Sequence, residues 1–239
     1  MMTKLLHLEQ HPGVNPSSFT STITSVSDDR IELQSTGYYP QGGGQPADKG
    51  VMVGADFECQ VIDVRKRESV LHYITDMSGT PNVGDRVECT IDSLWRNQLS
   101  AMHTAQHLVS ALANEEWGAQ TVGNQIGFDR TRIDLQFENR DAFDADHMSD
   151  LVNLAIEKNL PVKMDFRASQ ELIEDPLVRI NMDRMPPNID VWRTISIGDL
   201  DVCPCAGTHV EQTGDIPQVE ITRVKSKGAG RLRIEYILN

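Results

Sequence analysis

Two histidines stand four residues apart in the segment His103-Thr-Ala-Gln-His107. On an α-helix, residues at this spacing lie one turn apart on the same face, where both imidazoles can reach one metal ion. With seven histidines in the chain, one such pair is expected by chance often enough that the pair alone does not identify a site.

A second pair, Cys205 and His209, has the same spacing across a turn that contains Gly207. One thiolate and three imidazoles form a tetrahedral ligand set, which suits Zn²⁺ better than Mg²⁺ or Ca²⁺. The sequence therefore predicts one zinc ion held by this pair and the two histidines above. Cys203 is an alternative thiol ligand, and it is otherwise interpreted as a buried structural cysteine beside the end of a strand.

The helix that would carry the two histidines is predicted over 92–117, which contains no Gly or Pro, with Asp92 as its N-cap. Its apolar residues follow helical spacing and lie roughly opposite the histidines: Leu94, Ala101, Met102, Ala105, Leu108, Val109 and Leu112. The histidine side also carries Arg96, Ser100, Ser110 and Asn114. We therefore expect the histidines to lie off the apolar core face, and two solvent-facing histidines without a metal are the alternative.

The elements before this helix are predicted to be short strands separated by Gly, Pro, Asn and Asp. They are expected at 17–26, 30–34, 51–53, 59–64, 70–74 and 86–91. This spacing is typical of a small β-barrel, so the sequence predicts an N-terminal barrel domain over residues 1–91.

The remaining chain, 92–239, mixes helices and antiparallel strands and is predicted to be an α+β sandwich domain. Alternating apolar residues predict a half-buried strand at 132–137, and helical spacing predicts a second helix at 144–158. A strand at 162–166, a short helix at 169–174 and strands at 191–197 and 199–203 follow. The chain is expected to end in a hairpin with strands 219–224 and 231–238, joined by the loop 225–230.

The composition argues against polyanion-binding, membrane-spanning, secreted and disulfide-rich classes of protein. The 239 residues include 35 acids and 22 Lys and Arg residues, a net charge of −13, which argues against binding a polyanion through the overall field. No run of 18 apolar residues and no signal-peptide pattern are present, so we expect a cytoplasmic protein without membrane association. Four cysteines in such a chain are expected to be free thiols or metal ligands, not a disulfide framework.

Several enzyme classes are excluded by missing patterns. The segment from His103 to His107 lacks the glutamate that serves as general base in the His-Glu-x-x-His zinc peptidases. No phosphate-binding loop, nucleophile elbow or dinucleotide fingerprint is present.

Three blocks of residues together resemble one family. The first is the pair His103-x-x-x-His107 with Cys205-x-Gly-Thr-His209-Val and the following Thr-Gly-Asp. The second is TGYYPQGGGQPAD from Thr36 to Asp48, and the third is the Gly-rich basic stretch SKGAGRLR from Ser226 to Arg233. In this order they resemble the editing domain of alanyl-tRNA synthetases and its free-standing relatives, the AlaX-type trans-editing proteins. The chain departs from the family pattern at Ala206, where Gly is usual, and at Tyr38, where Phe is common, and neither position is a predicted ligand.

The resemblance implies hydrolysis of mischarged tRNA(Ala), chiefly the seryl form and also the glycyl form. It implies zinc at the four ligand residues. It also implies a substrate pocket whose residues are Thr36, Gly42, Gly43, Gly44, Gln45, Gln125 and Thr208. Without the resemblance, the three successive glycines would be interpreted as a mobile turn.

A local basic patch is the predicted contact for tRNA. Five basic residues crowd the terminal hairpin against two acids, Glu220 and Glu235; the basic residues are Arg223, Lys225, Lys227, Arg231 and Arg233. Backbone amides of the loop could also approach phosphate. A patch this small suits the acceptor end better than a long duplex, and an ordinary solvated hairpin is the alternative.

The number of candidate zinc ligands leaves three functions open. Catalytic zinc usually has three protein ligands and an open position, whereas four are available here. An editing deacylase, a module that binds tRNA through a structural zinc site, and a zinc hydrolase of another small ester or amide all remain. The sequence does not define the oligomeric state.

Overall fold

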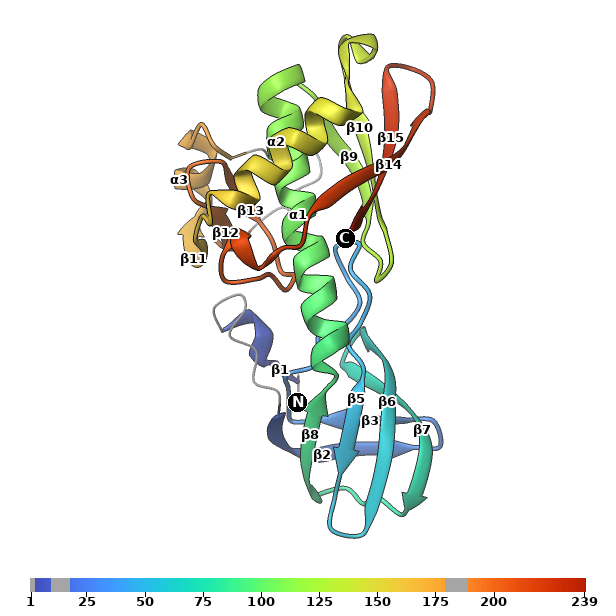
Figure 1. Ribbon diagram of the computed structural model, residues 1–239. Coiled ribbons are helices and arrows are strands. Elements are labelled where there is room, and N and C mark those ends of the chain that lie inside the picture. The colour runs from blue at the N-terminus through green and yellow to red at the C-terminus, as the bar shows by residue number, and fades with distance from the viewer. Residues whose placement is uncertain (1–2, 10–17, 179–188) are drawn as a thin grey trace. The chain divides into compact units, whose positions relative to one another are not determined.

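The computed structural model describes residues 3–9, 18–178 and 189–239, and these residues form two compact units, Met1–Gln98 and Leu99–Asn239. The boundary falls inside helix α1 (Ser93–Trp117). The predicted α+β class with an N-terminal β-barrel is confirmed (Figure 1).

The first unit is a closed six-stranded barrel with the strand order β2-β3-β7-β6-β5-β8. Its strands are β2 (Ser18–Ser27), β3 (Arg30–Leu33), β5 (Gly50–Val53), β6 (Phe57–Lys66), β7 (Val70–Gly79) and β8 (Arg86–Ile91). All six correspond to predicted strands, although β6 and β7 are longer than expected; Ser17, the predicted start of the first strand, lies outside the described residues. Alternating buried residues such as Ile31, Val61 and Val87 fill the barrel interior.

Short elements flank the barrel. A two-stranded parallel sheet pairs β1 (Lys4–Leu5) with β4 (Ser35–Thr36), and the 3₁₀ turn η1 (Leu6–Leu8) follows β1. Asp48 is fully buried and accepts hydrogen bonds from Arg96 Nε at 2.8 Å and from Tyr39 N at 2.5 Å. This ion pair ties the first turn of α1 to the segment that follows β4 within the first unit.

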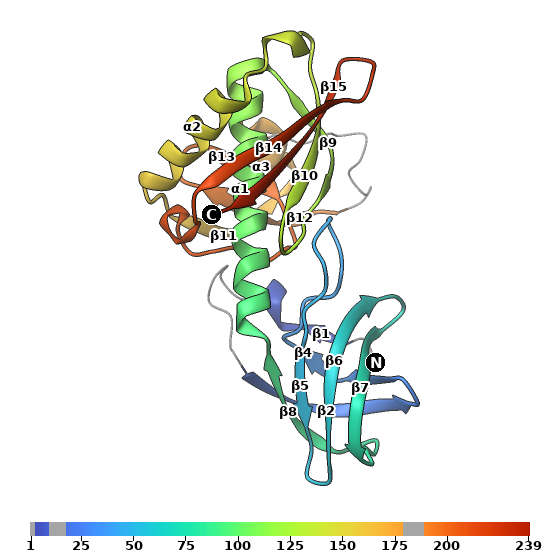
Figure 2. The ribbon, with the colours of Figure 1, turned by 45° about the vertical axis from the view of Figure 1, so that its right-hand side comes forward.

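The second unit contains two antiparallel sheets. One has the order β14-β15-β10-β9, and the other has the order β11-β12-β13 (Figures 1 and 2). The strands are β9 (Gln120–Gln125), β10 (Thr131–Gln136), β11 (Val162–Ala168), β12 (Val191–Ile197), β13 (Asp201–Pro204), β14 (Val219–Ser226) and β15 (Arg231–Leu238). Strand β9 was not predicted.

Helix α1 packs against both sheets of this unit. Tyr236 on β15 donates a hydrogen bond to the carbonyl of Met102 at 2.6 Å, and Asp201 on β13 contacts His107 at 2.9 Å. Asp92 caps the helix by accepting from Trp95 N at 3.0 Å, as predicted. Leu94, which the periodicity assigned to the buried face, is instead 74% exposed because it lies in the first turn.

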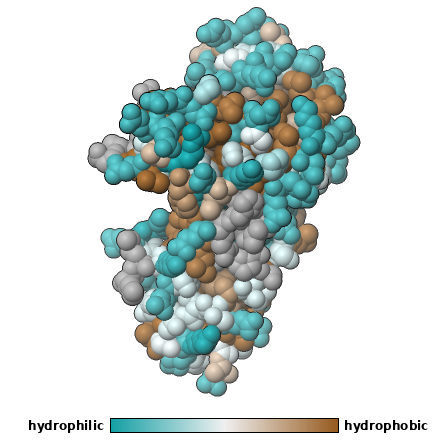
Figure 3. Space-filling view, turned by 90° about the vertical axis from the view of Figure 1, so that its left-hand side faces the viewer, coloured by the Kyte–Doolittle hydropathy of each residue, from teal (hydrophilic) through white to brown (hydrophobic). Residues whose placement is uncertain are grey.

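The described part of the second unit contains two further helices and two 3₁₀ turns. Helix α2 (Ala145–Glu157) begins at the cap Asp144 and packs on β14, where the Asn153 side chain bonds both backbone groups of Val219. The short elements are α3 (Ser169–Glu174), η2 (Arg140–Ala142) and η4 (Thr213–Asp215). On the face shown in Figure 3, hydrophilic residues cover much of the second unit, with smaller hydrophobic areas between them. No helix among the described residues is long and apolar enough to span a membrane.

Candidate metal centre

His103 and His107 project from the same side of α1, with their ring centroids 5.2 Å apart. The i, i+4 pairing is as predicted, but the solvent-facing alternative is wrong, because the two side chains are only 3% and 5% exposed. Their side of the helix is covered by β13 and by the loop that follows it. Arg96 and Ser100 on that side are buried as well.

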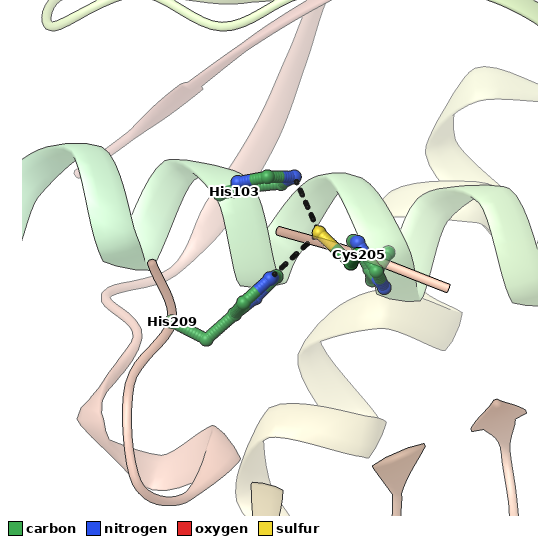
Figure 4. A group of neighbouring side chains, drawn as sticks. His103, Cys205 and His209 are labelled. Atoms are coloured by element: carbon green, nitrogen blue, oxygen red, sulfur yellow. Dashed lines mark hydrogen bonds between the residues drawn. The ribbon is translucent and has the colours of Figure 1, made fainter. Parts of the chain in front are cut away.

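Cys205 and His209 lie in this covering loop and complete a cluster with the helical histidines (Figure 4). The Cys205 thiol sulfur lies 3.3 Å from Nε2 of His209 and 3.6 Å from Nε2 of His103. The four candidate ligand atoms all lie within 4.8 Å of one another. The structure thus brings together all four predicted ligands in a group that could hold a metal ion.

Cys203, the alternative ligand, is not part of this group, and its thiol points to the carbonyl of Pro204 at 3.6 Å. None of the four cysteines, all of which lie in the described ranges, forms a disulfide.

The electrostatics of Cys205 and His209 favour the forms of these two side chains that bind metals, whereas hydrogen bonds to Asp201 and Cys205 outweigh burial and raise the pKa of His107 to about 10, so that His107 must lose a proton to bind a metal. Burial opposes ionisation of Cys205, but the neighbouring His103 and His209 hold the pKa of its thiol well below the usual range. Gly207 N also donates to this sulfur at 3.3 Å. Burial lowers the pKa of His209 to about 3, which keeps that imidazole neutral. A thiolate and a neutral imidazole are the forms that donate electron pairs to a metal.

Two side chains behind the ligands were not predicted. Asp201 Oδ2 lies 2.9 Å from Nδ1 of His107, and Thr104 Oγ1 lies 3.1 Å from Nδ1 of His209. Thr104 contacts a residue 105 positions away, so helix geometry does not mark it. Asp201 contacts a residue 94 positions away, and no local pattern marks it.

The predicted substrate residues fall in both units. Gln125 ends β9 and is exposed, whereas Thr208 is buried and accepts a hydrogen bond from Ser100 Oγ at 2.8 Å beside the cluster. Thr36 belongs to the first unit, where it is fully buried and its Oγ1 lies 2.9 Å from His72 Nε2 and 3.1 Å from Tyr38 N.

The glycine segment of the first unit forms a closed turn. Gly42 and Gln45 exchange backbone hydrogen bonds at 2.8 and 3.2 Å. Between them Gly43 and Gly44 have positive φ values of 55° and 86°, a conformation that favours glycine at both positions. The segment therefore has a defined hydrogen-bonded geometry.

The basic residues of the terminal hairpin differ in their surroundings. Arg233 forms a two-point ion pair with Asp134 at 2.7 and 2.8 Å, and Arg223 lies 3.7 Å from Glu235. The side chains of Lys225, Lys227 and Arg231 are exposed, and within the described ranges they take part in no ion pair.

Arg140 adds a basic group that the sequence reasoning missed. Its Nη1 donates to Ser226 Oγ at 2.6 Å, which places a guanidinium from η2 beside the hairpin loop. The contact joins residues 86 positions apart, so no local pattern predicts it.

Comparison with known proteins identifies two matching family models. Residues 192–235, which include Cys205 and His209, match the threonyl and alanyl tRNA synthetase second additional domain. Residues 12–95 match the class II (A) tRNA synthetases.

Among individual relatives, the alanyl-tRNA editing protein AlaX-M of Saccharolobus solfataricus is 32% identical over 91% of this chain and 92% of its own length. AlaX-M of Methanosarcina acetivorans is 33% identical over 92% of this chain and 94% of its own length. The chain belongs to the alanyl-tRNA editing protein family. An alanine–tRNA ligase of Halorubrum lacusprofundi is 32% identical over 86% of this chain but only 22% of the ligase, so the same region recurs inside a much larger synthetase.

Proposed function

We propose that this member of the alanyl-tRNA editing family is a zinc-dependent trans-editing hydrolase that deacylates mischarged tRNA(Ala), chiefly the seryl form and also the glycyl form. The observation that carries the proposal is the buried cluster of His103, His107, Cys205 and His209 in a chain whose relatives are named alanyl-tRNA editing proteins.

The donor set fits zinc. Tetrahedral Zn²⁺ with Zn–N distances near 2.0 Å and Zn–S distances near 2.3 Å separates its ligand atoms by about 3.3 to 3.6 Å. The distances from the Cys205 sulfur to the two nearest imidazole nitrogens, 3.3 and 3.6 Å, fall in this range. Three imidazoles and a thiolate also favour Zn²⁺ over oxygen-preferring cations. His103, His107, Cys205 and His209 would therefore hold the ion.

Zinc, when bound, supplies a Lewis acid that polarises a carbonyl or lowers the pKa of water to about 7. The chain's own residues supply position and a dry environment: α1 holds two ligands rigidly on one face, and β13 and the following loop exclude solvent from them. Exclusion of solvent strengthens electrostatic interactions with an ester carbonyl.

We propose Thr36 as the group that recognises the serine hydroxyl, and we propose the Gly42 to Gln45 turn, Gln125 and Thr208 as further substrate contacts. Nδ1 of His72 lies 3.0 Å from the carbonyl of Ile31 and must donate a hydrogen bond to it. Nε2 of the neutral imidazole therefore accepts a hydrogen bond from the hydroxyl of Thr36. Thr36 Oγ1 also accepts from Tyr38 N. One lone pair remains, and a serine hydroxyl would donate to it. Alanine has no hydroxyl and cannot make this hydrogen bond, which favours the seryl substrate over the correctly charged one.

We propose that the acceptor end of tRNA contacts the exposed basic residues of the β14–β15 hairpin, with Lys225, Lys227 and Arg231 foremost. Arg223 and Arg233, which we also predicted as contacts, already neutralise carboxylates and would contribute less. Positive charge confined to one loop suits contact with a few phosphates in a protein of net charge −13.

A second candidate function follows from the ligand count. Four protein ligands are typical of structural zinc, so a module that binds tRNA without chemistry is the alternative. A zinc hydrolase that acts on another small ester or amide is the third candidate function.

One experiment separates these functions: deacylation of seryl-, glycyl- and alanyl-tRNA(Ala) by the zinc-replete protein. The editing proposal expects release of serine far faster than of alanine. Binding of tRNA without release of any amino acid would favour the structural-zinc module, and neither binding nor release would favour another substrate.

A further inference from the structure

The hydrogen bonds behind the metal cluster define which nitrogen of two histidines carries the proton. Asp201 Oδ2 lies 2.9 Å from Nδ1 of His107, and both side chains are 5% exposed. A carboxylate oxygen only accepts, so Nδ1 of His107 must donate to it. In the neutral imidazole, which is the form that binds a metal, the electron pair therefore resides on Nε2.

The hydrogen bonds of Thr104 define the protonated nitrogen of His209 in the same way, because the Thr104 hydroxyl has only one proton to donate. Thr104 Oγ1 donates to the carbonyl of Ser100 at 2.8 Å, one turn earlier in α1, and accepts from Val210 N at 3.2 Å. The contact of Thr104 Oγ1 with Nδ1 of His209, at 3.1 Å, is longer than its hydrogen bond to Ser100. The hydroxyl proton of Thr104 is therefore assigned to the hydrogen bond with the Ser100 carbonyl. Nδ1 of His209 then donates to Thr104, and Nε2, which lies 3.3 Å from the Cys205 sulfur, keeps its electron pair.

Each of these two contacts joins α1 to β13 or to the loop that follows β13. Asp201 belongs to β13, which leads into Cys205, and it holds a histidine of α1. Thr104 belongs to α1, and it holds the histidine of the loop after β13. Each ligand-bearing element thus orients a ligand of the other, and Figure 4 shows the loop ligands facing the helix.

We propose that Asp201 and Thr104 are positioning residues of the metal site: they fix the tautomer and ring orientation in which His107 and His209 bind through Nε2. This inference rests on the metal site of the proposed function. Hydrogen-bond partners of metal-binding histidines commonly change metal affinity by about 10- to 100-fold.

The test measures zinc affinity by competition with a chromophoric chelator, on folded protein. Thr104→Val removes the hydroxyl and should weaken zinc binding by about 10- to 100-fold, and Thr104→Ser should restore it. Asp201→Ala should weaken binding to a similar extent, and Asp201→Asn, which keeps an acceptor for Nδ1, should retain more affinity.

A matched control is available in Thr213. This buried threonine likewise donates to a backbone carbonyl, that of Ala155 at 2.9 Å, and accepts from a backbone amide, that of Leu160 at 2.8 Å, but it contacts no histidine of the cluster. Thr213→Val should lower the stability of the fold and leave zinc affinity unchanged. Equal losses of affinity in Thr213→Val and Thr104→Val would show a merely structural effect and overturn the inference.

A second measurement needs no variant. Long-range ¹H–¹⁵N spectra of the zinc-loaded wild type should show protonated Nδ1 in both His107 and His209. Spectra with protonated Nε2 in either histidine overturn the assignment even if zinc binds normally. A wild-type protein that binds no zinc overturns the proposed metal site together with this inference, whereas wild-type affinity in both Thr104→Val and Asp201→Ala overturns the inference alone.

Discussion

His72 should make the stability of the barrel depend on pH. Its side chain is fully buried and hydrogen-bonded to Ile31 and Thr36, and burial lowers the pKa of the imidazole from 6.5 to about 4. Because the folded-state pKa is depressed, the full stabilisation is present above pH 6.5 and is lost as the pH falls toward 4. At about 1.4 kcal/mol per pKa unit, the whole shift corresponds to roughly 3 kcal/mol, of which about 2 kcal/mol is lost between pH 7 and pH 5.

The assay compares urea unfolding of the wild type and His72→Gln at both pH values, so that all other titrating groups cancel. Trp95 reports on the first unit, where its indole donates to the carbonyl of Ala47 at 2.9 Å. Trp117→Phe and Trp192→Phe in both proteins remove the signal of the second unit. The free energy of unfolding of the wild type should fall by about 2 kcal/mol more than that of His72→Gln. Parallel losses in the two proteins would show that His72 titrates alike in the folded and unfolded states and contributes no pH dependence.

Three further predictions address the proposed site. Metal analysis should give close to one zinc per chain, falling sharply in Cys205→Ala but not in Cys203→Ala; the reverse pattern would move the thiol ligand to Cys203. The double variant Lys227→Glu with Arg231→Glu should weaken tRNA binding and reduce its dependence on salt concentration without loss of zinc. Unchanged affinity and unchanged salt dependence would show that the hairpin is an ordinary solvated surface. Thr36→Val should reduce the difference in activation free energy between hydrolysis of seryl- and alanyl-tRNA(Ala) by about 1–3 kcal/mol, and Thr36→Ser is the control. An unchanged preference for serine in Thr36→Val would show that another group contacts the hydroxyl.

Local patterns predicted the elements well where periodicity and caps agree. Helix α1 begins after Asp92 and ends at Trp117 as expected, because the segment has a cap and no helix breaker. Strand β9 was missed, because Gln120–Gln125 has a single large apolar residue, Val122, and no alternation to detect.

The surroundings of the histidines could not be predicted from the helix alone. A polar helix face indicates solvent only if nothing covers it, and here β13 and its loop supply a partner for the polar groups of that face, as between Ser100 and Thr208. The same limit applies to Asp201, since contacts between distant segments follow from tertiary packing. The four residues of the cluster were nevertheless identifiable as candidate ligands, because in both pairs the spacing lets two side chains reach one metal ion.

Zinc dependence of the proposed hydrolysis is measured by titrating metal-free protein with zinc and following deacylation of seryl-tRNA(Ala) at each step. The rate should rise in proportion to added zinc and level off at one equivalent per chain. Cys205→Ala in the same titration should stay near the uncatalysed rate. Full activity of the metal-free protein, or no hydrolysis at one bound equivalent of zinc, would rule out a zinc-dependent editing hydrolase.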